Sequence, residues 1–122
     1  MATTPPVPDP LAPADDVRVF LSTITPGKAR KLAARLVEER LAACVNLVPG
    51  LRSIYRWKHE ICDEPETLLV IKTTAAKEAA LARRLGELHP YECPELLAVP
   101  PTAGLPAYLA WVAESVADDD RA

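Results

Sequence analysis

Hydrophobic positions in the first part of the chain recur at two different periods. Residues 17–24, VRVFLSTI, are rich in β-branched and large apolar residues, which predicts a strand. In residues 28–41, apolar residues recur at helical spacing with charged residues opposite them, which predicts an amphipathic helix. Thr25 and Pro26 supply an N-cap and a first-turn proline for this helix.

The middle of the chain predicts a long antiparallel hairpin. Residues 43–57, ACVNLVPGLRSIYRW, form a long apolar segment in which Pro49 and Gly50 are expected to produce a bend or bulge. Residues 58–66, KHEICDEPE, predict a polar connector. Residues 67–74, TLLVIKTT, are apolar on both faces, so we expect a strand in the centre of a sheet.

The last third predicts two more helices and one short strand. Thr74 can cap a helix over residues 75–88, a short strand is expected at 96–99, and a last helix at 106–116. The resulting order is β-α-β-β-α-β-α. It predicts an α+β fold of the ferredoxin-like split βαβ type, in which helices cover one face of an antiparallel sheet, with a long central hairpin and an extra C-terminal helix.

The proline distribution sets the expected domain boundaries. Five of the thirteen prolines fall within the first thirteen residues, so residues 1–15 predict a disordered or polyproline-like tail. Residues 16–117 predict one ordered domain, and residues 118–122 a frayed acidic end.

The predicted hairpin is too long for a small sheet. Strands usually span about five or six residues, so the far ends of these strands would overhang. Ile54, Tyr55 and Trp57 lie in the overhang, where an unpaired apolar edge favours aggregation. We therefore expect a partner for this edge, most simply another copy of the chain.

Charge and cysteine usage narrow the class of protein. The net charge is −3, and the cations of residues 28–41 alternate with alanine and leucine as on a solvated helix face, which argues against a nucleic-acid partner. The three cysteines, Cys44, Cys62 and Cys93, share no C-x-x-C spacing, which argues against a disulfide framework and fits a reducing cytosol. Neither a signal peptide nor an apolar run of about 20 residues is recognisable. We expect a cytoplasmic protein with no membrane partner.

The segment HPYECPE, residues 89–95, concentrates the candidate chemistry. Pro90 and Pro94 favour an extended conformation for the residues before them, and in an extended chain His89, Cys93 and Glu95 point the same way. Imidazole, thiolate and carboxylate together suit copper or zinc, with a fourth position left for water or a neighbouring subunit.

Two alternatives remain open for this segment. With polyproline geometry, His89, Glu92 and Glu95 align instead and Cys93 turns away. In a purely structural role, the prolines only end the helix and start the next strand, His89 satisfies the last helix carbonyls, and Glu95 is a hydrogen-bond acceptor.

Other candidate residues point to weaker chemistry. Cys44 opens a hydrophobic strand and favours core packing. His59 and Cys62 could form a weak surface metal site. A pairing of Cys93 with His89 as nucleophile and base lacks an obvious oxyanion hole, and the sequence holds no G-x-S-x-G, Walker or G-x-G-x-x-G motif, so we do not expect an enzyme.

Several separated motifs resemble the CutA family of divalent-cation-tolerance proteins. They are ERLAACVNLVPGLRSIYRW, LLVIKTT, HPYECPELLAVP and YLAWV, and the similarity covers about residues 17–115. The resemblance implies a ferredoxin-like protomer in a tight homotrimer whose long strands pair between subunits. It also implies copper binding through His89 and Glu95, together with a cysteine at the end of the first strand. Here that place holds Ser22, or Leu21 if the register slips by one, so Cys93 is the candidate soft donor.

Two functions follow as hypotheses. The first is a cytoplasmic homotrimer that binds copper or a similar divalent ion through His89, Glu95 and Cys93, with no obligatory cofactor, and contributes to the metal-ion response. The second is a rigid trimeric signalling or scaffold module resembling the P-II regulators, which binds a metabolite or an unidentified protein in inter-subunit clefts.

Overall fold

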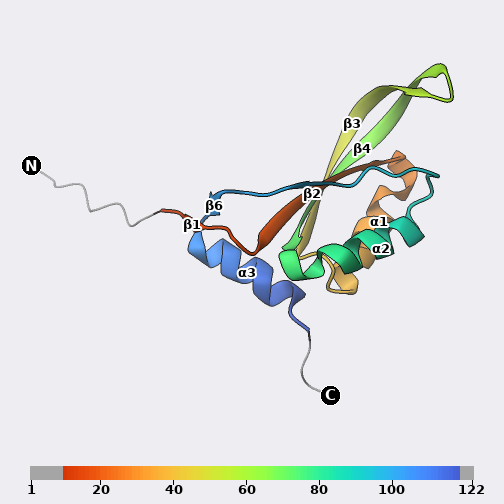
Figure 1. The fold of residues 1–122 in the computed structure, drawn as a ribbon. Coiled ribbons are helices and arrows are strands. Elements are labelled where there is room, and N and C mark those ends of the chain that lie inside the picture. The colour runs from red at the N-terminus through yellow and green to blue at the C-terminus, as the bar shows by residue number, and fades with distance from the viewer. Residues whose placement is uncertain (1–9, 119–122) are drawn as a thin grey trace, which may run out of the picture.

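A four-stranded antiparallel sheet forms the centre of the molecule in the computed structural model, which describes residues 10–118. The inner strands are β2 (Val17–Ile24) and β4 (Glu60–Thr74), and the edge strands are β3 (Cys44–Trp57) and β5 (Leu97–Val99), in the order β3-β4-β2-β5. Residues 67–74 therefore lie in a central strand, as their apolar character on both faces predicts (Figure 1).

Two helices cover one face of this sheet. They are α1 (Pro26–Glu38) and α2 (Glu78–Leu88), the latter preceded by a 3₁₀ turn over Ala75–Lys77. Apolar side chains of both helices pack against β2 and β4 in one core that includes Phe20, Ile71, Leu36 and Leu85. The predicted β-α-β-β-α-β order and the α+β class are confirmed (Figure 1).

The boundaries of α1 differ slightly from the prediction. The helix begins at Pro26 and ends at Glu38, and Arg40 then adopts a left-handed conformation with φ 59°. Thr25 and Thr74 stand at the starts of α1 and the 3₁₀ turn, but neither side chain makes a capping hydrogen bond.

The third helix belongs to a separate small cluster. Helix α3 (Pro106–Val116) packs Val112 and Val116 against Val17, the first residue of β2, and Ala14, just before that strand. A two-stranded sheet stands beside it, formed by β1 (Ala12–Pro13) and β6 (Ala103–Gly104) (Figure 1).

The ordered part of the chain starts before residue 16. Ala12 and Pro13 pair with β6, and Ala14 is buried, so this stretch of the predicted tail is structured. Residues 1–9 of that tail, and residues 119–122 of the predicted frayed end, lie outside the described residues. Asp118 forms an ion pair with Lys77.

The prediction of a polar connector over residues 58–66 is wrong. Strand β3 turns back through only Lys58 and His59, both in left-handed conformation with φ 49° and 71°, and β4 begins at Glu60. Such a two-residue turn matches the twist of the flanking strands. Residues 60–66 therefore extend β4, and the hairpin projects well beyond the helices (Figure 1).

Pro49 and Gly50 interrupt the hairpin as predicted. The pairing register between β3 and β4 shifts between Val48 and Leu51, and Gly50 has φ 84°. A positive φ suits glycine because it has no Cβ.

The sheet face opposite α1 and α2 is apolar and largely uncovered. Beyond the part that α3 contacts, it presents side chains that are half-buried or exposed: Val19, Leu21, Leu68, Val70, Leu97 and Val99. The most exposed of these side chains is Leu97, at 58%. Within residues 10–118, no helix has the length and apolar character needed to cross a bilayer.

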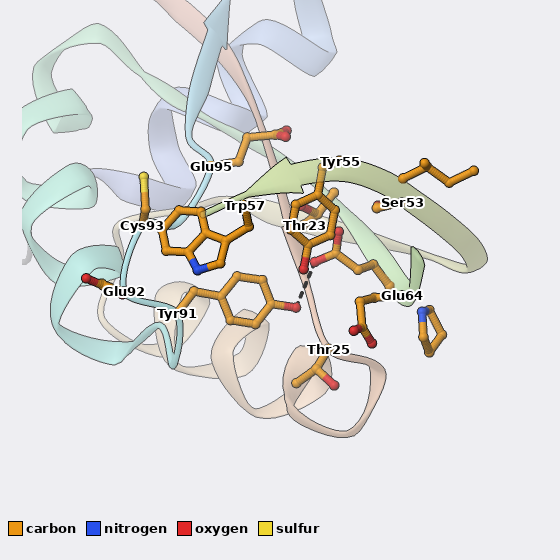
Figure 2. Close-up of a pocket in the computed structure, with 13 residues that line it drawn as sticks. Thr23, Thr25, Ser53, Tyr55, Trp57, Glu64, Tyr91, Glu92, Cys93 and Glu95 are labelled. Carbon is orange, nitrogen blue, oxygen red and sulfur yellow. Dashed lines mark hydrogen bonds between the residues drawn. The ribbon is translucent and has the colours of Figure 1, made fainter. Parts of the chain in front are cut away.

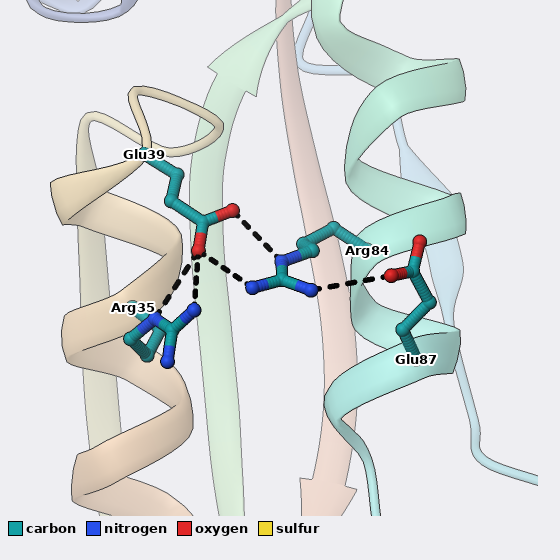
Figure 3. Close-up of polar contacts among 4 residues, drawn as sticks. All are labelled: Arg35, Glu39, Arg84 and Glu87. Atoms are coloured by element: carbon teal, nitrogen blue, oxygen red, sulfur yellow. Dashed lines mark hydrogen bonds and ion pairs between the residues drawn. The ribbon is translucent and has the colours of Figure 1, made fainter.

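A polar network ties the outer surfaces of the two sheet-covering helices together. Glu39, just after α1, accepts hydrogen bonds from Arg84 of α2 and from Arg35 of α1, and Arg84 also pairs with Glu87 (Figure 3). Arg84 first, and then Arg35, lowers the pKa of the Glu39 carboxyl group below its ordinary value.

Candidate functional site

A cleft of about 730 Å³ opens where the hairpin leaves the sheet. One wall comes from β3 and β4 and the second from the segment that follows α2; Thr23 at the end of β2 and Thr25 just before α1 also line the cleft. The side chains that matter for its chemistry are Tyr55, Trp57, Glu64, Glu66, Tyr91, Glu92, Cys93 and Glu95 (Figure 2).

The hairpin places alternate side chains of its two strands on the cleft. Ser53 pairs across the ladder with Glu64, and Leu51 with Glu66, so that one face of the overhang carries the two glutamates. Tyr55 and Trp57 follow at the same two-residue spacing. The overhang is therefore a wall of the site, with aromatic and acidic side chains side by side.

The two walls are joined by one hydrogen bond. The Tyr91 hydroxyl donates to Oε2 of Glu66 at 2.7 Å, and Glu66 is only 6% exposed (Figure 2). Burial, and next this hydrogen bond, raises the pKa of Tyr91 far above its ordinary value, so the hydroxyl stays a donor at any physiological pH.

The electrostatic character of the cleft is one-sided. Its lining contains four glutamates and no lysine or arginine among the described residues: Glu64, Glu66, Glu92 and Glu95. A recess lined by one sign of charge concentrates counter-ions. The cleft is therefore suited to cations.

His89 lies beside the cleft but is engaged by the backbone. It is 6% exposed, its Nε2 lies 2.9 Å from the carbonyl oxygen of Thr23, and its Nδ1 accepts the N–H of Tyr91 at 3.2 Å. A neutral ring with its proton on Nε2 satisfies both contacts. Its own backbone N–H donates to Leu85, which ends α2. In this arrangement the ring positions Tyr91 and offers no ring nitrogen to a ligand.

The first-strand position at which the CutA resemblance implies a cysteine ligand contacts the same segment. Ser22 is fully buried in β2, and its hydroxyl donates to the carbonyl oxygen of Glu95 at 2.7 Å. The Glu95 main chain is thus a structural acceptor, while its side chain is exposed and lines the cleft.

Cys93 is the exposed thiol of the cleft. A bend over Tyr91–Cys93 breaks the alternation expected for an extended segment, and Figure 2 shows Cys93 and Glu95 pointing in different directions from it. Within residues 10–118, no three His, Cys, Asp or Glu side chains are grouped closely enough to hold a metal ion. Copper binding through His89, Glu95 and Cys93 stays a prediction.

The remaining cysteines lie elsewhere. Cys44 is half-buried at the start of β3 rather than in the core, with its Sγ 3.9 Å from Oδ1 of Asn46. Cys62 is half-buried opposite Tyr55 in the hairpin.

Glu64 and Glu66 were not among the residues that the sequence analysis singled out. Both lie in the segment predicted as a connector, so their alternate positions on one face of a strand were not recognised. The available signal was the two-residue period of E-I-C-D-E-P-E, which continues the following strand once the turn is placed at Lys58 and His59.

The antiparallel sheet, its projecting hairpin and the two helices on one face define a small α+β protein with an acidic, aromatic cleft. The chain belongs to the CutA family, because residues 17–115 match the family model described as CutA1 divalent ion tolerance protein.

Relatives of known name agree with this assignment. The divalent-cation tolerance protein CutA of Thermus thermophilus is 52% identical over 87 residues, which cover 71% of this chain and 84% of that protein. Longer relatives are covered less: the match spans 58% of the Xenopus laevis CutA homologue and 52% of human CutA.

Solved structures share the fold. CutA of Synechococcus elongatus has a TM-score of 0.85 at 37% identity, covering 89% of this chain and 97% of that one. CutA from the same organism was also solved in complex with a Bis-Tris molecule, with a TM-score of 0.79 at 40% identity, covering 86% and 98%. A structure from Nostoc, described as a PII-like protein CutA in apo form, has a TM-score of 0.77 at 36% identity, covering 82% and 97%.

Proposed function

We propose that this chain forms a homotrimeric, cytoplasmic divalent-cation tolerance protein that binds copper or a similar ion in the cleft and contributes to the metal-ion response. The observation that carries the proposal is the lining of the cleft, which combines four carboxyl groups with an accessible thiol and, among its described residues, no lysine or arginine. The proposed role is binding, not catalysis.

Cys93 and Glu95 are the candidate donors with accessible side chains; because they point in different directions, they have to turn toward one another to share an ion. Both side chains are exposed and line the cleft, and thiolate with carboxylate suits a soft or borderline ion. His89 joins them only if its ring leaves the carbonyl oxygen of Thr23. Two protein donors hold a metal weakly, so water or a neighbouring subunit has to complete the coordination.

The apolar surfaces of the single chain support self-association. The uncovered sheet face is apolar, the overhang of the hairpin exposes Ile54 (71%) and Ile61 (62%), and β3 is a 14-residue edge strand. Long unpaired apolar edges are normally covered in native proteins. A sister copy accounts for both surfaces, and the number three follows from the resemblance to the CutA family.

The cytoplasmic location rests on the cysteines. All three described cysteines are free thiols, which suits a reducing compartment. The contrary case is a CutA structure from Archaeoglobus fulgidus described as periplasmic, with a TM-score of 0.79 at 31% identity, covering 83% of this chain and 99% of that one.

Copper titration by calorimetry tests the donor assignment. We expect Cys93→Ser and Glu95→Gln each to weaken copper binding by about tenfold or more. Cys62→Ser is the matched control, because Cys62 lies outside the lining, and it should leave the affinity unchanged. Equal affinity in wild type, Cys93→Ser and Glu95→Gln would refute this site.

A P-II-like signalling or scaffold role is the second candidate. It is favoured by the aromatic part of the cleft, where Tyr55, Trp57 and Tyr91 supply ring surface that a metal ion does not use. The relatives solved with Bis-Tris and described as PII-like are consistent with a small-molecule site. In this case a metabolite or a partner protein occupies the cleft and metal binding is incidental.

A further inference from the structure

We infer that the cleft binds a small protonated alkylamine, held between its aromatic rings and its carboxylates. The inference rests on the proposed function, because it assigns a ligand class to the same cleft. It differs from a metal site in using the aromatic wall as well as the acidic one.

The lining matches the two halves of such a molecule. Tyr55, Trp57 and Tyr91 offer apolar surface to an alkyl chain, and the faces of aromatic rings attract an ammonium group within about 6 Å. The four glutamates accept N–H hydrogen bonds and favour a positive charge. The cleft volume of about 730 Å³ lies in the range typical of small-molecule sites.

The chain itself already places an alkylammonium at the rim. Lys58, in the hairpin turn, holds its Nζ 5.6 Å from the centre of the Trp57 ring and 3.6 Å from Oε2 of Glu92. Trp57 and Glu92 both line the cleft, whereas Lys58 does not. One ring and one carboxylate of the cleft therefore contact a primary ammonium in the structure.

Lys58 consequently acts as an internal competitor. A free amine that contacts Trp57 and Glu92 has to displace the Lys58 ammonium. Both partners of that ion pair are more than two-thirds exposed, with side-chain exposures of 71% and 73%, so displacement is easy. Removing the Lys58 charge should therefore tighten amine binding.

Putrescine and the uncharged butanediol of the same length are the probes. Binding to the full-length protein is measured by calorimetry in the presence of EDTA, which removes metal ions. We expect putrescine to bind about tenfold or more tightly than the diol. Trp57→Leu should lower the affinity for putrescine by a similar factor. Lys58→Gln should raise the affinity for putrescine by about two- to fivefold. The control Lys28→Gln removes a charge from α1 outside the cleft and should have no effect.

Several results would overturn the inference. They are equal binding of putrescine and diol, absence of putrescine binding, or unchanged putrescine affinity in Trp57→Leu. If Trp57→Leu does not fold, Glu92→Gln replaces it, because this exposed side chain is expected to tolerate substitution. Copper titration without EDTA separates the two proposals. If copper binds and putrescine does not, only the amine proposal is refuted. If putrescine binds and copper does not, only the metal proposal is refuted.

Discussion

The Tyr91–Glu66 pair is the residue-scale feature that holds the cleft in shape. Glu66 is buried at the base of the overhang, and its carboxylate accepts a hydrogen bond from Tyr91 in the segment after α2. His89 holds that segment to β2 through the carbonyl oxygen of Thr23 and accepts the N–H of Tyr91. A histidine that the sequence suggests as a metal ligand thus also has a positioning role, which spacing alone cannot reveal.

Tyr91→Phe should destabilise the protein, because it leaves the buried Glu66 carboxyl group without its hydroxyl donor. We expect a loss of about 1–3 kcal/mol in the free energy of unfolding, measured by chemical denaturation. Tyr108→Phe, at an exposed position on α3, is the control and should change little. Equal losses for the two variants would contradict the role given to the Tyr91 hydroxyl.

His59 carries a second prediction at this scale, because its φ of 71° disfavours β-branched side chains. His59→Val should lower stability by about 1–2 kcal/mol. His59→Gly should not, since glycine adopts this conformation without a steric penalty. Thermal unfolding of both variants checks the two-residue turn, and a stable His59→Val protein would argue for a longer connector.

At the scale of elements, local pattern predicted most of the fold. The strand at 17–24 and the helix at 106–116 lie where their periodicity places them. The hairpin turn was missed because Lys58 and His59 are not the residues that usually mark a left-handed turn. The β1–β6 pairing was missed because two-residue strands carry no periodic signal and depend on tertiary contacts. Because the turn was misplaced, the acidic residues that the hairpin contributes to the cleft, Glu64 and Glu66, were not predicted either.

The network around Glu39 predicts a specific pH dependence for the contact between α1 and α2. The folded-state pKa of Glu39 is depressed by Arg84 and Arg35, so its contribution to stability is present above the unfolded-state pKa and is lost as the pH falls through the folded-state pKa. Glu39→Gln should therefore be less stable than wild type at about pH 6, with the difference shrinking toward about pH 3.

Denaturation midpoints across this pH range measure the effect. Glu38→Gln, one residue earlier and outside the network of Arg35, Glu39, Arg84 and Glu87, is the matched control. A wild-type advantage over Glu39→Gln that stays constant with pH would contradict the electrostatic role of the network.

At the scale of the whole molecule, large apolar side chains stay exposed on the single chain, among them Leu97, Ile54 and Ile61. They lie on the sheet face opposite α1 and α2 and on the overhang of the hairpin, whose strands β3 and β4 form one wall of the cleft. Assembly would therefore both cover these surfaces and supply the donors that a metal bound to Cys93 and Glu95 lacks.

Leu97→Lys should disrupt assembly, because a charge on the uncovered sheet face is tolerated in one chain but not between copies. Sedimentation equilibrium should give three chain masses for wild type and a smaller mass for the variant. Val37→Lys, at an exposed position on α1, should keep the wild-type mass. An unchanged mass for Leu97→Lys would exclude this face from the interface.

The most direct test of the central claim, that the cleft is a cation site, is anomalous diffraction from a crystal soaked in copper. The account predicts a copper peak within bonding distance of Cys93 Sγ and the Glu95 carboxylate, inside the cleft. A peak confined to His59 and Cys62, or no ordered copper in the cleft at all, would contradict it.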